Sequence, residues 1–336
     1  MTRTERTLTD KAINHHCSVT ISALLNPIDA MSDQPGSTKK LYAPRYWPTW
    51  LGVALLWCLV HLPFAAQVRL GRGIGRLFML FAPKRRRIVR VNLELCFPEL
   101  DAKARQAILV KNFESMGIAI FEMGMSWWSP DSKLEKLFTL EGMEHLEQAL
   151  SAGKGTILLG AHFTNLEIGG RLLSMRTPVQ VLYRAHKNAA MEYVISRGRK
   201  SFTQKIIHRD NLLAMRRSLR QNLVVWYAPD QDFGIGKGTF VPFFGIPAAT
   251  ITVTTTLAKM AGSIVVPFIQ TRLPGSQGYA LRLYPALADF PGESPEADSA
   301  QINAFIEARV REQPEQYLWA HRRFKTRPPG MPSLYD

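Results

Sequence analysis

The sequence predicts an α/β protein: a single globular domain with a central mixed sheet flanked by helices, preceded by an N-terminal membrane-anchor helix. Beyond residue 100, short apolar runs of β-prone residues alternate with stretches of helical spacing, which is typical of a sheet covered by helices. The chain has 336 residues, 46% of them hydrophobic, which is enough for one large core. An uncharged apolar stretch near the N-terminus supplies the expected anchor helix.

Residues 1–40 are polar and show no clear hydrophobic periodicity, so we expect them to form a disordered extension. Met31 would serve as a natural amino terminus, which marks residues 1–30 as an upstream addition. The folded part of the chain is therefore expected to begin after residue 40.

The segment 46–68 contains no Asp, Glu, Lys or Arg. A membrane-spanning helix needs roughly 20 mainly apolar residues, and this segment just reaches that length. Trp47, Trp50 and Trp57 would suit the membrane interface, whereas Pro63 weakens the helical pattern. We predict a membrane-anchor helix over 46–68, with a buried or interfacial helix as the alternative.

The segment 69–100 is basic and amphipathic. Apolar residues interleave with arginines at helical spacing, and the basic run 84–87 follows them. Such helices lie on anionic lipid, and basic residues directly after an apolar segment place that side in the cytoplasm. We predict a membrane-surface segment, with an ordinary solvated basic face as the alternative. The residues of the pattern are Arg69, Arg72, Arg76 and Arg90 with Leu70, Ile74, Leu77, Phe78 and Phe81.

The main domain is expected over residues 101–330. Its apolar positions recur at helical spacing in some stretches and form short β-prone runs in others. Asp101 and Asp210 are the expected caps of two helices. The predicted helices are 101–129, 143–152, 166–173, 189–201, 211–220, 250–261 and 299–312, and the predicted strands are 138–141, 156–159, 179–183, 223–227, 264–272 and 279–284.

The charge and the cysteines narrow the class of protein. The formal net charge of +15 and the pI of about 9.9 favour a polyanionic partner: nucleic acid, an anionic membrane, an acidic protein or a phosphorylated substrate. Cys17, Cys58 and Cys96 lie far apart and form no CxxC pair, so they indicate neither a disulfide framework nor a zinc site.

His162 and Glu167 are the first candidates for chemistry. The apolar strand 156–159 reaches two small residues and then His162, while Glu167 follows on the first turn of a helix. Active sites of open α/β sheets lie at the carboxyl ends of strands, and an imidazole oriented by a carboxylate transfers protons. The alternative is a histidine bonded at a turn, with Glu167 favoured by the helix dipole.

Asp230 and Asp232 are the second candidates. They follow the strand 223–227, so they are expected at the same sheet edge as His162. Two acids suggest a metal, but no further ligands occur at a matching spacing, and an ordinary turn is the alternative. The glycine-rich loop 234–238 lacks the spacing of a phosphate loop, which argues against a nucleotide site.

Arginines at strand ends and on helices are the third candidates. Arg184 follows the strand 179–183, and Arg199 lies on the helix 189–201. Arginine grips phosphate and carboxylate through paired hydrogen bonds, although most arginines here are expected to be solvated surface charges. The sequence contains no Gly-x-Ser-x-Gly elbow, which disfavours a serine hydrolase.

Six strings of the sequence together resemble one family. They are GAHFTNLE (160–167), LYR (182–184), SRGR (196–199), VVWYAPDQDFG (224–234), VPFFG (241–245) and PEQYLWAHRRFKTRP (314–328). From about residue 40 onward the chain is similar to late lipid A acyltransferases of the lauroyl/myristoyl type, a Gram-negative branch of the lysophospholipid acyltransferase-like superfamily. The wider superfamily usually has H-x4-D, whereas this chain has Glu167 at the acid position, as the lipid A branch does.

The resemblance implies transfer of a fatty acyl chain, lauroyl being the expected one, from acyl carrier protein. The acceptor would be the hydroxyl of a 3-hydroxyacyl chain of Kdo-lipid IVA, at the cytoplasmic face of the inner membrane, to which a single-pass anchor would fix the domain 101–330. Anionic membrane lipid is a further expected partner and nucleic acid is not. No metal or cofactor is expected, because a thioester is already activated.

The resemblance also implies roles for the site residues. His162 would be the general base, and Glu167 would orient its imidazole. Arg199 would contact the phosphate or sugar acid of the substrate, and Asp230 would organise the site. The remaining expected substrate-binding or site-organising residues are Asn165, Arg184 and Asp232.

Two other functions stay open at this stage. An enzyme with the same dyad would act on a lysophospholipid or another glycolipid. A non-catalytic peripheral membrane protein or nucleic-acid-binding protein would use the arginine-rich segment alone. The length of the acyl chain depends on where the acyl pocket ends, and the sequence places no residue there.

Overall fold

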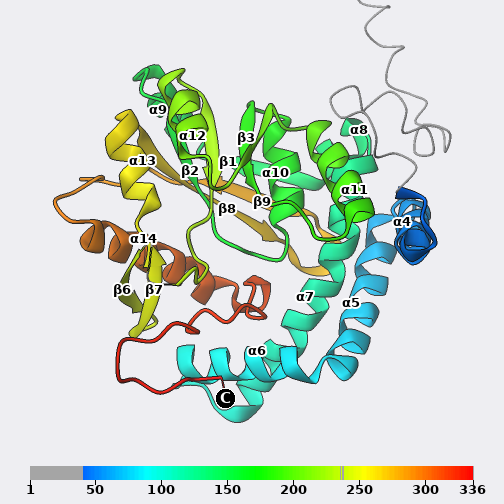
Figure 1. Cartoon of the computed structure of the whole chain (residues 1–336). Coiled ribbons are helices and arrows are strands. Elements are labelled where there is room, and N and C mark those ends of the chain that lie inside the picture. Colours follow the sequence, from blue (N-terminus) through cyan, green and yellow to red (C-terminus); the bar gives the residue numbers. More distant parts are fainter. Residues whose placement is uncertain (1–40, 235, 237, 336) are drawn as a thin grey trace, which may run out of the picture.

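The computed structural model describes residues 41–234, 236 and 238–335. The predicted disordered extension over residues 1–40 lies outside the described residues. A central sheet carries helices on both of its faces, and the first helices of the described chain gather along one side of the molecule, coloured blue to cyan in Figure 1. This arrangement is the predicted α/β domain.

The main sheet is mixed, as predicted. Within the described residues it has seven strands in the order β1-β9-β8-β2-β5-β3-β4. β9 runs antiparallel to β8, and the other neighbouring pairs are parallel. A separate antiparallel hairpin joins β6 (Gly238–Phe243) to β7 (Ile246–Ile251). The strands of the main sheet are β1 (Phe138–Glu141), β2 (Thr156–Leu159), β3 (Val179–Tyr183), β4 (Lys205–His208), β5 (Val224–Tyr227), β8 (Ile264–Arg272) and β9 (Tyr279–Leu283).

The two faces of the sheet bury two separate apolar cores. Successive side chains of a strand point to opposite faces, so Leu158 and Leu159 of β2 enter different cores. Leu158 packs in the core that contains Leu172, and Leu159 in the core that contains Leu219. The helices around the sheet are α7 (Ala102–Trp128), α8 (Asp131–Leu134), α9 (Met143–Ser151), α10 (Leu166–Ser174), α11 (Ala189–Lys200), α12 (Leu212–Arg220), α13 (Val253–Ala261) and α14 (Pro295–Glu312).

Most predicted elements of the main domain are confirmed within one or two residues. Asp101 caps α7, because its carboxylate accepts the N–H of Ala104 at 2.6 Å. The predicted cap of α12 is wrong by one position, since the Asn211 side chain and not Asp210 accepts the N–H of Ala214. Residues 250–251 end β7 instead of starting a helix, and α14 begins earlier than expected, at Pro295.

The predicted single helix over 46–68 is wrong. The chain forms α4 (Trp47–Leu59), turns, and begins α5 (Phe64–Phe81) directly after Pro63, whose ring favours a helix start. The buried Gln67 amide holds this corner by donating to the carbonyls of Val60 and Leu62, at 2.9 and 2.8 Å. No helix in the described part of the chain is both long and apolar enough to cross a membrane.

Helix α5 turns its small residues inward and its large apolar residues outward. It packs along α7 (Figure 1), where a Cβ on Gly75 would lie 2.1 Å from the Phe113 carbonyl oxygen. Gly117 of α7 is equally close to the Gly71 carbonyl oxygen. The predicted amphipathic segment 69–100 is therefore two helices, α5 and α6 (Pro83–Cys96), and the apolar side chains of α5 lie on the surface. They include Leu70, Ile74, Leu77, Phe78, Leu80 and Phe81.

Candidate functional site

The loop that carries His162 starts where the parallel strands β2 and β5 end side by side. The N–H of Gly160 donates to the Tyr227 carbonyl at 2.8 Å, which continues the pairing of β2 with β5. A Cβ on Gly160 would lie 2.3 Å from Nε1 of Trp226, so glycine is required for this approach. The chain then passes through His162 and enters α10 at Leu166.

A segment from far along the chain holds this loop in place. The N–H of Thr164 donates to the Gln316 carbonyl at 2.7 Å, and the N–H of Leu318 donates to the His162 carbonyl at 2.9 Å. These bonds surround an isolated antiparallel bridge between Phe163 and Tyr317. Both sides of His162 are thus fixed by backbone hydrogen bonds.

Asp230, which follows β5, is the carboxylate that holds His162. Its Oδ1 lies 2.6 Å from Nδ1 of the imidazole, and its Oδ2 accepts the backbone N–H of His162 at 2.9 Å. The Asp230 side chain is 1% exposed, whereas that of His162 is 29% exposed. An ionised carboxylate only accepts, so Nδ1 carries the proton and Nε2 is left with its lone pair.

Asp230 is ionised because its hydrogen bonds outweigh its burial. Burial alone would raise its pKa, but electrostatic attraction to the His162 imidazole, the bonds from the ring and backbone of His162, and the bond from the Tyr317 hydroxyl lower the pKa to about 2. The pair has the form of a general base with an orienting carboxylate.

Glu167 does not hold the imidazole, and that prediction is wrong. It lies on the first turn of α10, which directs its side chain toward α11 and α7. There Nε of Arg199 donates to its Oε1 at 2.9 Å, Nη2 of Arg199 donates to its Oε2 at 2.5 Å, and Nε1 of Trp127 donates to its Oε1 at 3.0 Å. Glu167 still lines the same cavity as His162.

Arg199 is held in a partly buried position by this carboxylate. Burial would lower the pKa of its guanidinium, but the ion pair with Glu167 raises it, so the charge is kept. The guanidinium carbon lies 5.1 Å from the centre of the Tyr183 ring. Arg199 therefore stays charged, and its charge is already paired with that of Glu167.

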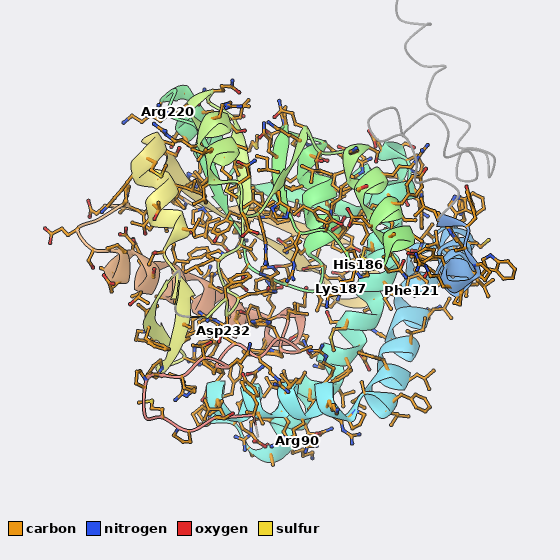
Figure 2. The ribbon with its side chains drawn as sticks, in the orientation of Figure 1. Arg90, Phe121, His186, Lys187, Arg220 and Asp232 are labelled. Atoms are coloured by element: carbon orange, nitrogen blue, oxygen red, sulfur yellow. The ribbon has the colours of Figure 1, made fainter. Side chains whose placement is uncertain are left out.

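Asp232 organises a loop and does not line the cavity. Its carboxylate accepts the N–H and the hydroxyl of Thr326, at 2.6 and 2.8 Å, and its own N–H donates to Nε2 of His321 at 2.9 Å. Figure 2 shows Asp232 near the β6–β7 hairpin. Burial, with Arg323 and His162 acting in the same direction, lowers the pKa of His321 to about 4, so this imidazole is neutral and accepts the bond.

Asn165 and Arg184 take different places. The Asn165 amide is buried and donates to the Gln316 side chain at 3.1 Å and to the Gln270 carbonyl at 3.3 Å, so it ties the loop to β8 and organises the site. Arg184 lines the cavity and is exposed at its mouth. Figure 2 places the neighbouring His186 and Lys187 close to α11.

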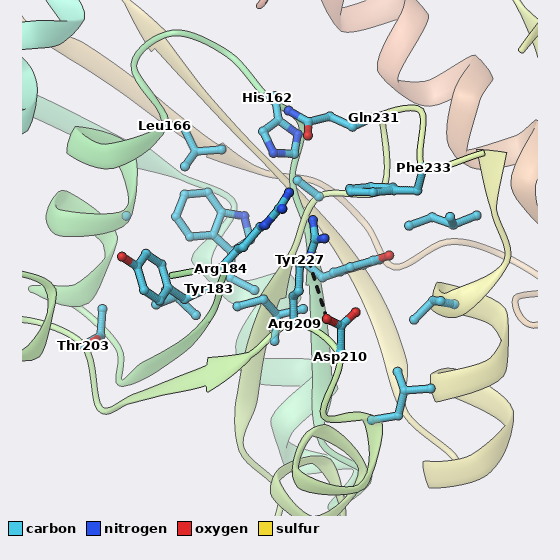
Figure 3. A pocket seen from close by; sticks show the side chains of 18 of the residues that line it. His162, Leu166, Tyr183, Arg184, Thr203, Arg209, Asp210, Tyr227, Gln231 and Phe233 are labelled. Carbon is cyan, nitrogen blue, oxygen red and sulfur yellow. Dashed lines mark ion pairs between the residues drawn. The ribbon is translucent and has the colours of Figure 1, made fainter. Parts of the chain in front are cut away.

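A cavity of about 950 Å³ opens beside His162, at the carboxyl ends of β2, β5 and β3. Figure 3 shows His162 at its head, with Leu166 and Tyr183 on one side and Phe233 on the other. The lining combines apolar side chains such as Leu166 with charged ones such as Arg184 and Arg209, which suits a substrate with both hydrocarbon chains and anionic groups. In the described part of the chain, no group of three or more His, Cys, Asp or Glu side chains is arranged to hold a metal ion.

Sequence reasoning missed the part of the site that comes from the end of the chain. The string 314–328 supported the family resemblance, but none of its residues was among the predicted site residues. Arg323 is in fact buried and donates to the Ala249 carbonyl at 2.7 Å, a structural role. The contributions of Gln316, Tyr317 and His321 depend on contacts across more than half of the domain, which no local spacing reveals.

Comparison with known proteins places this geometry in a family. The model of the family described as bacterial lipid A biosynthesis acyltransferase matches residues 34–326. The chain is 41% identical to the lipid A biosynthesis lauroyltransferase of Escherichia coli (strain K12), over 91% of this chain and 100% of that protein. It is 40% identical to the palmitoleoyltransferase of lipid A biosynthesis from the same organism, over 89% of this chain and 97% of that protein.

The myristoyltransferase of lipid A biosynthesis from Escherichia coli (strain K12) is more distant. It is 29% identical to this chain, over 88% of this chain and 92% of that protein. The family model and the first two relatives each cover nearly the whole described domain, including the residues of the His162 site. The chain therefore belongs to the bacterial lipid A biosynthesis acyltransferase family and is an acyltransferase of lipid A biosynthesis.

Proposed function

We propose that the protein transfers a fatty acyl chain from the thioester of acyl carrier protein to the hydroxyl of a 3-hydroxyacyl chain of Kdo-lipid IVA. The observation that carries this proposal is the His162–Asp230 pair at the head of a largely apolar cavity. Nε2 of His162 accepts the proton of a hydroxyl there, and the apolar walls hold hydrocarbon. A lauroyl chain is the expected donor, as in the name of the relative that is 41% identical.

The chemical steps need only the side chains of the site. His162 takes the proton of the acceptor hydroxyl as its oxygen attacks the thioester carbonyl, and Asp230 stabilises the imidazolium that forms. The tetrahedral intermediate then collapses: the new ester C–O bond stays, the C–S bond breaks, and the thiolate takes the proton from His162. The thioester supplies the activation, so we propose a reaction without metal or other cofactor.

Arginines at the mouth of the cavity suit the anionic parts of both substrates. Arg184 is exposed there, whereas Arg199 is already paired with Glu167. We therefore assign the first contact with a phosphate or sugar acid to Arg184, and we give Arg199 the role of shaping the wall of the cavity. The net charge of +15 favours association with acyl carrier protein, an acidic partner.

The test of the proposed reaction compares two acceptors. The full chain, purified in detergent and supplied with lauroyl-acyl carrier protein, should acylate Kdo₂-lipid IVA, and mass spectrometry should place the new chain on a secondary ester. A lysophospholipid at the same concentration should react far more slowly. Faster acylation of the lysophospholipid would refute the proposed acceptor, while no transfer to either would refute the proposed donor.

The outward face of α5, with the exposed part of α4, is the surface that would meet the cytoplasmic face of the inner membrane. Phe81 of α5 is 78% exposed and Leu51 of α4 is 72% exposed. Arg72 and Arg76 also lie on α5, and both contact Glu114 of α7. Apolar side chains beside arginines suit an anionic lipid surface.

Introducing negative charge on this apolar surface should release the protein from lipid. The double variant Leu77→Glu and Phe81→Glu should lose most of its sedimentation with vesicles that contain anionic lipid, because two carboxylates would have to enter the headgroup region. Leu213→Glu, at a residue 68% exposed on α12, is the matched control. Equal sedimentation of the double variant and the control would contradict the assigned surface.

A further inference from the structure

The segment 315–321 lies between the His162 loop on one side and the helices α6 and α7 on the other. Figure 1 shows this orange-red part of the chain above α6. Toward the loop, the Gln316 carbonyl accepts the N–H of Thr164 at 2.7 Å. The N–H of Leu318 donates to the His162 carbonyl at 2.9 Å. The position of the loop therefore depends on the position of this segment.

Asn112 of α7 holds the first half of the segment from the helix side. Its Nδ2 donates to the carbonyl oxygens of Glu315 and Tyr317, at 2.9 and 2.7 Å, and its side chain is fully buried. Its Oδ1 has no hydrogen-bond partner among the residues that the structure describes. An unpaired buried oxygen costs free energy, so what this carboxamide contributes is its pair of N–H donors.

Asn92 of α6 holds the second half of the segment in the same way. Its Nδ2 donates to the carbonyl oxygens of Trp319 and His321, at 2.7 and 2.8 Å, and this side chain is also fully buried. On the other side, its Oδ1 accepts the hydroxyl of Tyr335. The orientation of the carboxamide is thus fixed from both ends, because carbonyl oxygens can accept only from its NH2 group.

Side chains are needed here because a helix cannot bind another segment through its own backbone. The N–H groups inside α6 and α7 are already used within each helix, so carbonyls that face the side of a helix need donors from side chains. Buried backbone carbonyls are nearly always paired. Asn92 and Asn112 meet this need at four alternate residues, which leaves the segment bonded to the helices on one edge and to the His162 loop on the other.

The segment also bears on the carboxylate that holds the imidazole. The Tyr317 hydroxyl donates to Asp230, and the Tyr317 ring packs edge-to-face on Phe163, with ring centres 5.7 Å apart. Leu318 binds the backbone of His162 directly. A shift of the segment would therefore move both the base and the carboxylate that orients it.

We infer that Asn92 and Asn112 are positioning residues of the acyl transfer, which hold the segment 315–321 so that Nε2 of His162 faces the acceptor hydroxyl. The inference rests on the proposed function, in which His162 is the base. Neither asparagine lines the cavity of about 950 Å³, so each acts through the segment and not on the substrate.

The test uses Asn92→Ala and Asn112→Ala in the full chain, with lauroyl-acyl carrier protein and Kdo₂-lipid IVA as substrates. A misplacement of reacting groups by about 1 Å can cost roughly 100-fold in rate. Each substitution should therefore lower kcat by roughly 10- to 100-fold and leave KM for the acceptor within about twofold, because the cavity lining is unchanged. Turnover is measured well below the thermal midpoint of each variant.

Asn303→Ala is the matched control. Asn303 of α14 is 1% exposed and donates to the Pro242 carbonyl at 2.9 Å and to the Thr250 hydroxyl at 3.2 Å, so it holds the β6–β7 hairpin and not the His162 loop. Its loss also leaves a buried carbonyl unpaired, so the thermal midpoint should fall. The kcat of this variant should stay within about threefold of the wild type, since the base is not displaced.

Backbone hydrogen exchange gives a readout that general destabilisation would not move. In the Asn92 and Asn112 variants, the N–H groups of Thr164 and Leu318 should exchange faster relative to those of β2 and β5, because the segment opens locally. In Asn303→Ala this ratio should match that of the wild type.

Tyr335→Phe carries the test if an alanine variant fails to fold. It removes only the hydroxyl that orients the Asn92 carboxamide and accepts the N–H of Phe324. The kcat should fall by roughly two- to tenfold, the worth of one neutral hydrogen bond, with KM for the acceptor again nearly unchanged.

The outcomes separate this inference from the proposed function. If the wild type transfers no chain, or if His162→Ala keeps its turnover, the proposed function fails. If His162→Ala is inactive but folded Asn92 and Asn112 variants lose no more kcat than Asn303→Ala, the inference is overturned. A rise in acceptor KM at unchanged kcat, or exchange that rises evenly across the sheet, would also overturn it.

Discussion

The two carboxylates of the site, Asp230 and Glu167, are bound in opposite ways. Asp230 is almost fully buried and gives both of its oxygens to His162, one to the ring and one to the backbone. Glu167 is 12% exposed and gives both of its oxygens to Arg199. The carboxylate close to His162 in sequence is thus not the one that holds it.

The difference shows how a helix start separates neighbours. His162 lies before α10, while Glu167 lies on its first turn, where side chains radiate from the axis and this one meets α11. Asp230 arrives from the next strand of the sheet, whose carboxyl end is adjacent to that of β2. Here the carboxylate at the end of the adjacent strand reaches the imidazole, and the carboxylate five positions along the same strand-to-helix connection does not.

The largest expected loss of turnover follows from removing the imidazole of His162. His162→Ala should reduce turnover by about 10²- to 10⁴-fold, the usual contribution of a positioned general base. The thermal midpoint should also fall, because the buried Asp230 carboxylate loses its ring partner, so turnover is measured well below the midpoint of the variant. Turnover close to that of the wild type in a folded variant would remove His162 from the mechanism.

Asp230→Asn should have a similar effect and is the sharper test of the comparison. An amide can donate to Nδ1, which would move the imidazole proton to Nε2 and leave no acceptor for the hydroxyl, so we expect a loss of about 10²- to 10⁴-fold in kcat. The KM for the acceptor should change little. If the variant keeps most of its kcat, Asp230 does not hold the base.

The stability of the protein in acid should depend on the interaction between Asp230 and His162. The folded-state pKa of Asp230, about 2, lies below its ordinary value of 3.8, so its ionised form stabilises the fold above pH 3.8. That contribution, about 2–3 kcal/mol of unfolding free energy, should disappear as the pH falls toward 2.

Urea unfolding at several pH values between 4 and 2 measures this loss. Asp230→Asn should show a correspondingly flatter pH dependence there, since the amide does not titrate. Identical pH slopes in the two proteins would contradict the low pKa.

The smallest effect is expected for the other carboxylate. Glu167→Gln keeps one acceptor for Arg199 but removes the ion pair, so turnover should fall by roughly 10- to 100-fold, the worth of a hydrogen bond to a charged group. Arg199→Lys, which loses the paired geometry, should fall by a similar factor. A loss in Glu167→Gln as large as that in Asp230→Asn would reverse the comparison.

The sequence predicted much of the fold because its signals are local. The strands 156–159 and 179–183 and the cap at Asp101 follow from runs and spacings within a few residues. β4 and the β6–β7 hairpin escaped prediction, since β4 is short with polar ends and β6 contains Gly238 and Pro242. The corner after α4 was missed because Gln67 holds it through backbone contacts that hydropathy does not register.

The residues of the site were predicted better than their pairing. His162, Glu167, Arg184 and Arg199 all line the cavity, and Asp230 lies behind it against His162. Their partners are set by side-chain direction at helix starts and by the order of strands in the sheet, neither of which can be read from spacing.

The backbone hydrogen bonds that hold the His162 loop also determine when the site can form during synthesis. Gln316 and Leu318 bind the loop on both sides of His162, and residues up to Thr326 fix Asp232. A ribosome adds these residues only after the whole sheet has been made, and they must leave its exit tunnel before they can dock. A nascent chain can therefore complete its sheet while its base is still unheld, and the site forms only when this later segment has docked.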